Sequence, residues 1–259
     1  LTAVPSETEP AIRDRLLLFI AEAISSFLPG DLRADVHDQV LATTIRLSRE
    51  TQDADAWRSY TRAFIAEFAA RGGDEYEATV RSFAASDNPD IAWRARRALA
   101  ARGLVDAGAI EAWRSADGSG EAARMSVEAL ASLPIEEARR HAWESVYSET
   151  LSNDFLTATL AGLQASSWEG EPGIEAAVDR LRSYWESHTI GMALRYANGV
   201  LAYGLDSDRD GSVSRSVGLL RSWLDTNSDA PAQLRRIVIE HLDAFERDER
   251  VQRRWKQDQ

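Results

Sequence analysis

The chain has 259 residues and a formal net charge of −12. Because phosphates and anionic lipids are bound by clustered Lys and Arg, we expect neither nucleic acid nor a membrane surface among its partners. The absence of cysteine excludes disulfides, thiolate zinc sites and a cysteine nucleophile, and it fits the cytoplasm, where we expect the protein to reside. We find no signal peptide, and no segment has the roughly 20 apolar residues that span a bilayer. The first residue is Leu1 rather than Met, so we expect a piece of a longer protein.

Apolar residues at helical spacing dominate the chain from its first segment. A helix is predicted over residues 10–28, with one apolar face formed by Ile12, Leu16, Phe19, Ile20, Ala23 and Phe27. Asp31 is expected to be the N-cap of the next helix. Further helices are predicted near residues 31–50, 56–71, 75–86, 90–103, 106–116, 119–132, 135–148, 153–165, 172–186, 188–204, 213–225 and 231–247.

This pattern predicts an all-α protein, because valine and isoleucine recur at helical spacing and no segment alternates as a strand does. Helices of this length with short turns favour a superhelical array of antiparallel helix pairs, an α-solenoid of the HEAT or armadillo kind. We find no fixed repeat period, so the array is expected to be irregular. One domain over residues 1–259 is predicted, and a closed multi-helix bundle is the alternative.

Sequence motifs for catalysis are absent. A helical zinc site needs two histidines four residues apart, but the four histidines lie on separate segments. Neither a nucleophile elbow nor a phosphate-binding loop is present. Gly118 and Gly120 are interpreted as a turn between helices, with Ser119 as an N-cap. We therefore predict no catalytic residue, no metal ligand and no cofactor in this segment.

The segment DSDRDGSV resembles the first half of a calcium loop. Asp206, Asp208 and Asp210 stand at positions one, three and five, and Gly211 stands at position six. Position twelve requires a bidentate carboxylate, but Val217 stands there. A solvated acidic turn is the preferred interpretation, and weak calcium binding is the alternative.

The predicted helix over 188–204 contains the only candidates for a substrate-facing surface. Arg195 and Tyr196 could belong to a concave face that contacts peptides. Small residues nearby, including Gly199, would permit close helix packing. The alternative is a packed helix whose arginine extends along the surface.

A set of ordered features resembles the C-terminal helical domain of actinobacterial aminopeptidase N. In that family a short Asp-x-Thr/Ser-x-Gly turn precedes an Ala-rich helix, followed by a Pro-led helix ending near Ala-Trp and then a Leu-Ser/Pro-Asn segment. The matching residues here are Asp117, Ser119, Gly120, Pro134, Ala142, Trp143, Thr150, Leu151, Ser152 and Asn153. The segments 183–204 and 231–255 are also similar to the last helices of the family, so the resemblance covers most of the chain. In one place the chain departs from the family: DSDRDGSV stands where relatives have a short Pro-containing loop.

The resemblance implies part of a gluzincin zinc metallopeptidase that removes N-terminal residues from peptides. The zinc, its ligands and the general base of such enzymes lie in an upstream catalytic domain, so this segment alone is expected to be inactive. Its implied role is to close over that domain and to shape the chamber for peptide substrates. Its implied partners are the catalytic and N-terminal domains of the same polypeptide. The alternatives are a free-standing helical scaffold that binds a protein and a calcium-responsive helical module.

Overall fold

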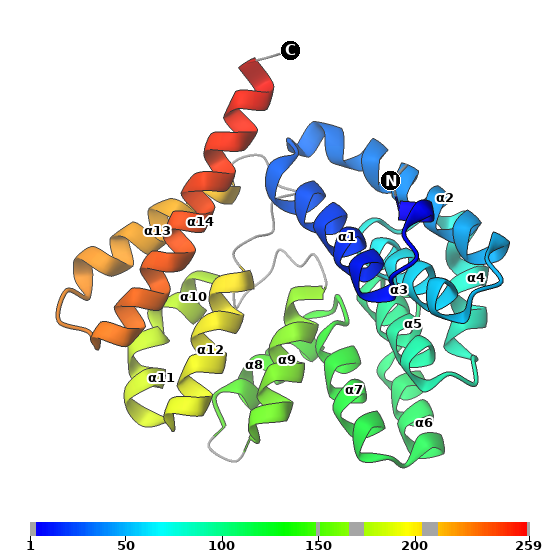
Figure 1. The fold of residues 1–259 in the computed structure, drawn as a ribbon. Helices are drawn as coiled ribbons and strands as arrows, with labels where there is room; N and C mark the ends of the chain where they lie inside the picture. Colours follow the sequence, from blue (N-terminus) through cyan, green and yellow to red (C-terminus); the bar gives the residue numbers. More distant parts are fainter. Residues whose placement is uncertain (1–3, 149–150, 166–173, 204–211, 258–259) are drawn as a thin grey trace.

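The computed structural model describes residues 4–148, 151–165, 174–203 and 212–257. All of the regular structure in these ranges is helical, and they contain no strand, so the all-α class is confirmed. Figure 1 shows the helices following an arc around the molecule. The elements are η1 (Val4–Ser6), α1 (Pro10–Glu22), η2 (Ala23–Phe27), α2 (Gly30–Glu50), α3 (Ala54–Arg71), α4 (Asp74–Ala84), α5 (Pro89–Ala101), α6 (Ala107–Asp117), α7 (Gly120–Ala131), α8 (Glu136–Val146), α9 (Asn153–Ala165), α10 (Ile174–Asp179), α11 (Leu181–Ser187), α12 (Ile190–Tyr203), α13 (Ser212–Thr226) and α14 (Ala232–Gln257). Among these helices, none combines the length and apolar content needed to cross a bilayer.

The helices form two layers. In the first layer α1, α3, α5, α7, α9, α12 and α14 contact one another in that order. The second layer packs on it: α2 on α3, α4 on α5, α6 on α7, α8 on α7 and α9, α10 and α11 on α12, and α13 on α14. Within the described ranges α2, α4, α6 and α8 have at most weak contacts with one another. The first layer is therefore the continuous one.

Buried apolar side chains fill the space between the layers in two main clusters. One lies in the N-terminal half and includes Phe64, Phe68 and Ile91. The larger one lies in the C-terminal half and runs from α7 to α14. This burial is the main source of stability, because the hydrophobic effect grows with the apolar area removed from water.

The last helix contacts an N-terminal element of the arc. Segment η2 is a π-helix that continues α1, and it contacts α14. The side-chain amide of Gln252 donates a hydrogen bond of 2.8 Å to the carbonyl of Ser26. The last helix thus returns to the N-terminal end of the arc (Figure 1).

Some predicted helix ends were wrong. The N-cap of α2 is Pro29 rather than Asp31, which lies in the first turn. The helix predicted over 172–186 is divided at Arg180 into α10 and α11. The last helix continues ten residues beyond its predicted end at 247, because the charged tail forms ion pairs four residues apart, such as Glu249 with Arg253.

Two glycines let first-layer helices approach closely. A Cβ atom on Gly162 of α9 would lie 2.2 Å from the carbonyl oxygen of Glu128 on α7. A Cβ atom on Gly199 of α12 would lie 2.7 Å from the side chain of Leu160 on α9. The first contact is with backbone, which cannot move aside as a flexible side chain can. Gly162 therefore determines the spacing of α7 and α9.

Replacing Gly162 with alanine should destabilise the protein, because the methyl group overlaps the backbone of α7. Overpacking of this kind costs about 1–3 kcal/mol. The control is Gly218→Ala in the middle of α13, where a Cβ atom would meet nothing within 4 Å. Gly218→Ala should raise stability by about 0.5–1 kcal/mol, since alanine has the better helix propensity. Urea unfolding of the two variants checks the contrast, and equal effects would contradict it.

Candidate functional site

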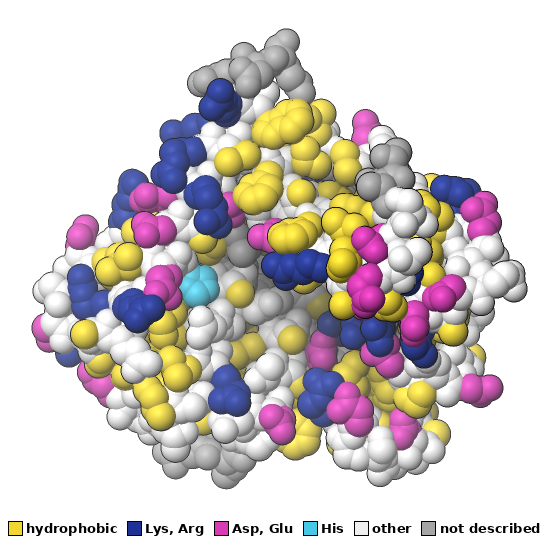
Figure 2. Space-filling model, viewed as in Figure 1, with side chains coloured by type: hydrophobic (Ala, Val, Ile, Leu, Met, Phe, Trp, Pro, Cys, Tyr) yellow, Lys and Arg dark blue, Asp and Glu magenta, His cyan; other side chains and the backbone are white. Residues whose placement is uncertain are grey.

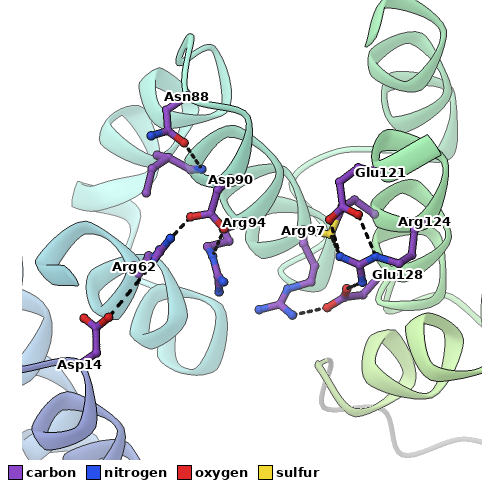
Figure 3. Close-up of polar contacts among 11 residues, drawn as sticks. Asp14, Arg62, Asn88, Asp90, Arg94, Arg97, Glu121, Arg124 and Glu128 are labelled. Carbon is purple, nitrogen blue, oxygen red and sulfur yellow. Dashed lines mark hydrogen bonds and ion pairs between the residues drawn. The ribbon is translucent and has the colours of Figure 1, made fainter. Parts of the chain in front are cut away.

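A row of ion pairs joins the first-layer helices on the N-terminal side of the arc (Figure 3). The carboxylate of Asp90 on α5 receives a hydrogen bond of 2.8 Å from Arg62 Nε on α3 and another of 2.8 Å from Arg94 Nε. Arg62 Nη1 also lies 4.0 Å from Asp14 on α1. Asp90 and Arg94 meet because they are four residues apart on one helix, whereas Arg62 and Asp14 come from neighbouring helices.

The row continues from α5 to α7. Arg97 on α5 forms an ion pair with Glu128, whose side chain is largely buried. Arg124 Nη1 lies 3.8 Å from the other oxygen of Glu128, and Arg124 also pairs with Glu121. These eight residues are called the charge ladder: Asp14, Arg62, Asp90, Arg94, Arg97, Glu121, Arg124 and Glu128. Each carboxylate of the ladder faces at least one guanidinium, so the ladder suits holding helices in register better than moving protons.

The electrostatics of Asp90 follow from this arrangement. Partial burial acts to raise the pKa of Asp90, but the hydrogen bonds from Arg62 and Arg94 outweigh it, so this pKa lies below its ordinary value. Asp90 therefore remains ionised over the physiological range. Asn88, two residues before Asp90, caps α5 by accepting a hydrogen bond of 3.3 Å from the amide of Ile91.

A second polar site lies inside the C-terminal core. The rings of Tyr184 and Tyr196 stack with centroids 4.0 Å apart, and His188 stacks on Tyr184 at 3.8 Å. The hydroxyl of Tyr196 donates a hydrogen bond of 2.8 Å to the carbonyl of Ala177, and it lies 3.4 Å from the hydroxyl of Tyr147. These aromatic side chains join α8, α11 and α12.

Burial controls how these tyrosines titrate. It raises the pKa of Tyr184 to about 12, and the charge of Tyr147 acts in the same direction. Burial is also the main reason that the pKa of Tyr196 lies far above its ordinary value. Both phenols are therefore neutral at physiological pH. Within the described ranges the hydroxyl of Tyr184 has no hydrogen-bond partner, whereas that of Tyr196 does.

The two residues predicted to face a substrate have different environments. Arg195 is exposed on α12 in the first layer, and its guanidinium donates a hydrogen bond of 3.0 Å to the carbonyl of Gly191. Tyr196 is only 1% exposed and lies in the aromatic cluster, so its ring has no open surface in this chain. Of the pair, only Arg195 is placed where a peptide could reach it, and that contact stays a prediction.

Metal ligands do not cluster in the part of the chain that the structure describes: no group of three or more His, Asp or Glu residues is close enough to hold an ion. His37 is partly buried and pairs with Glu67 at 2.5 Å, a contact between α2 and α3. The proposed calcium ligands Asp206, Asp208 and Asp210 lie outside the described residues. The interpretation of that segment as a turn stays a prediction.

Three of the residues that carry the family resemblance have structural roles. The Ser119 hydroxyl caps α7 by accepting a hydrogen bond of 3.0 Å from the amide of Ala122, as predicted. The Asp117 carboxylate accepts a hydrogen bond of 3.1 Å from the indole of Trp93 on α5. Trp143 is buried and stacks on Tyr147. The matched turn thus fastens α6 and α7 to α5.

An apolar pocket of about 570 Å³ lies between α7, α8 and α9. Leu130, Leu133, Ile135 and Phe155 are among the residues that line it. The first three lie at or beyond the C-terminal end of α7, away from the Asp90 part of the charge ladder at the start of α5.

The sequence does not indicate the charge ladder as a whole. Two pairs within one helix have spacings that predict an ion pair: Asp90 with Arg94 and Glu121 with Arg124. Many exposed pairs in the chain have the same spacings, so they do not single out the ladder. Nothing in the sequence links Arg62 to Asp90 or Arg97 to Glu128, because these partners lie 28 and 31 residues apart.

No family model matches the chain, and no curated protein is significantly similar to it.

Replacing Asp90 with asparagine should lower stability near neutral pH and leave it unchanged in acid. A carboxyl whose folded-state pKa is depressed stabilises the protein above its unfolded pKa of about 4, and this contribution is lost as the pH falls through the folded value. The difference between wild type and Asp90→Asn should therefore shrink as the pH falls below about 4 and vanish once the pH has passed below the depressed folded-state pKa of Asp90. Urea unfolding across this range measures it. The exposed Asp35→Asn serves as a control, and a difference independent of pH would contradict the prediction.

The two stacked tyrosines should respond oppositely at neutral pH. Tyr184→Phe removes an unpaired hydroxyl and should be nearly neutral or stabilising, whereas Tyr196→Phe breaks a hydrogen bond and should cost about 1 kcal/mol.

In alkali the wild-type protein should lose stability because of the raised pKa of Tyr184. The loss begins above about pH 10, where the tyrosine of the unfolded chain ionises, and continues to about pH 12, where Tyr184 ionises in the folded protein. Tyr184→Phe should lose less over this window. Chemical unfolding at neutral pH and near pH 11 tests both points. A larger neutral-pH loss for Tyr184→Phe than for Tyr196→Phe would refute the assignment.

Proposed function

We propose that the chain is the C-terminal helical domain of a zinc-dependent aminopeptidase N and that it shapes the peptide chamber of that enzyme. The observation that carries this proposal is the two-layered helical arrangement, combined with the ordered sequence features over 109–164. The matching residues that the structure describes lie in the α6–α7 turn, just before and near the end of α8, and at the beginning of α9. A family resemblance based on turns, caps and core residues is expected for a domain without catalytic groups.

The layers support a superhelical array of the HEAT kind. In such an array the inner helices contact one another in succession, and the outer helices spread apart on the convex side. The first layer here has the continuous contacts, so we assign it to the concave side. The face seen in Figure 2 is hollowed near its centre, and this is the side that we assign to the chamber. Exposed Arg195 belongs to the first layer and is the candidate for peptide contact.

Helix α1 supports docking onto another domain. Three large apolar side chains of α1, Ile12, Leu18 and Phe19, are about half exposed. In Figure 2 hydrophobic side chains gather in the upper middle of the view, where Figure 1 places α1 and the upper part of α14. Clustered exposed apolar residues indicate an interface, whereas single ones do not. We assign the α1 cluster to contact with the catalytic domain of the same polypeptide.

In this proposal the zinc and the general base belong to the upstream domain, which would supply the hydrolysis of the N-terminal peptide bond. The present chain contributes closure and selection of substrates, since closure of a domain over a site excludes water and commits the substrate. The location that we propose is the cytoplasm.

The test uses the full polypeptide that carries this chain. Its reading frame should encode a His-Glu-x-x-His motif with a downstream glutamate. Removing residues 1–259 should reduce hydrolysis of peptides of several residues more than hydrolysis of a small aminoacyl amide, because only the longer substrates need the chamber. A frame without a zinc peptidase would overturn the proposal and leave a free-standing protein-binding scaffold.

A surface variant tests docking separately. Phe19→Asp places a charge in the proposed interface and should loosen the contact between domains, seen as faster proteolysis between them and lower peptide turnover. Ile135→Asp is the matched control, because Ile135 is 50% exposed and Phe19 is 49% exposed. Equal behaviour of the two variants would exclude α1 as the docking surface.

A further inference from the structure

The contact between η2 and α14 closes the arc of helices. Ser26 lies in the last turn of η2, where backbone carbonyls have no partner within the helix. Gln252 supplies one by donating to the Ser26 carbonyl, although the two residues are 226 positions apart. One turn before Gln252 on α14 lies Asp248, which is also directed at this end of η2.

Asp248 is poorly placed to be ionised. It is only 4% exposed, and its Oδ1 atom has no hydrogen-bond partner among the residues that the structure describes. Asp248 forms a long ion pair with Arg247 of the same helix, whose Nε lies 3.8 Å away and whose side chain is mostly exposed to water. From the facing elements the carboxyl meets the side chain of Ser26 on η2 and the like charge of Glu22 at the end of α1. The C-terminal end of a helix also has a negative partial charge, which disfavours a nearby carboxylate.

These interactions together favour the neutral acid. Burial is the main reason that the pKa of Asp248 lies above its ordinary value; Glu22 acts in the same direction, and Arg247 and Ser26 only partly oppose them. A group with a raised folded-state pKa stabilises its contact below the ordinary value and loses that contribution as the pH rises through the raised one. The loss therefore begins above about pH 4.

We propose that Asp248 is a proton-operated clamp between the two ends of the chain. When Asp248 is protonated, α14 remains seated on η2. When it ionises, the buried charge meets Glu22 and the helix end, and α14 separates from η2 so that the carboxylate can reach water. The clamp thereby controls how far the first and last helices of the arc stand apart. It does not depend on the proposed peptidase role.

The chain has no cysteine, so two introduced cysteines give a clean distance probe. Spin labels at Ala34→Cys on α2 and Arg250→Cys on α14, both exposed positions, report the separation of the two ends. The distance between the two labels is measured by double electron–electron resonance from about pH 4 to about pH 8. Circular dichroism verifies that the chain is folded at each pH. The separation should widen as the pH rises.

Three further variants in the labelled protein identify the group responsible. Asp248→Asn imitates the protonated acid and should hold the short distance at every pH. Glu22→Gln removes the like charge and should move the opening midpoint to lower pH. Asp243→Asn, an exposed carboxylate on the same helix, should leave the midpoint unchanged.

A distance that does not vary with pH in the otherwise wild-type protein overturns the clamp. The same pH response in Asp248→Asn also overturns it. If Asp248→Asn does not fold, the Glu22→Gln variant decides, because an unmoved midpoint there excludes a role for this charge pair.

Discussion

The close approach of α7 and α9 is the constraint on which the rest of the first layer depends. Gly162 allows α9 to lie against the backbone of Glu128 on α7. The side chain of Glu128 forms an ion pair with Arg97 on α5. Helix α7 therefore contacts α9 on one side and is joined to α5 by this ion pair on the other. A wider spacing at Gly162 would displace α12 as well, because Gly199 packs on Leu160 of α9.

Two kinds of interaction complement each other along this layer. In the C-terminal half, helices approach through small residues and bury aromatic side chains, so packing alone gives a defined arrangement. In the N-terminal half, the charge ladder joins α1, α3, α5 and α7 through partly exposed groups. Exposed ion pairs add little energy, but a largely buried carboxylate such as Glu128 must keep its partner. The ladder therefore contributes more to register than to total stability.

The proposed function depends on the first layer being continuous. Contacts in succession from α1 to α14 produce one surface, and the exposed residues of the layer, including Arg195, lie along it. The proposed clamp at Asp248 would act on the same surface by controlling the separation of its two ends. A domain that encloses a chamber needs both features: a continuous layer of helices, and a contact between elements that can open.

The sequence by itself determined the all-α class, most helix positions and the cap at Ser119, because helical periodicity and capping are local properties of the chain. Ser119 is an example, since its hydroxyl bonds to an amide three residues away. Only the tertiary structure decided which helices form the continuous layer, that Tyr196 is buried while Arg195 is exposed, and that Arg62 meets Asp90. The physical reason is that these contacts join residues far apart in the chain, and their pairing depends on how whole helices stack. The meeting of Ser26 with Gln252 across 226 residues is the extreme case, which no local pattern could indicate.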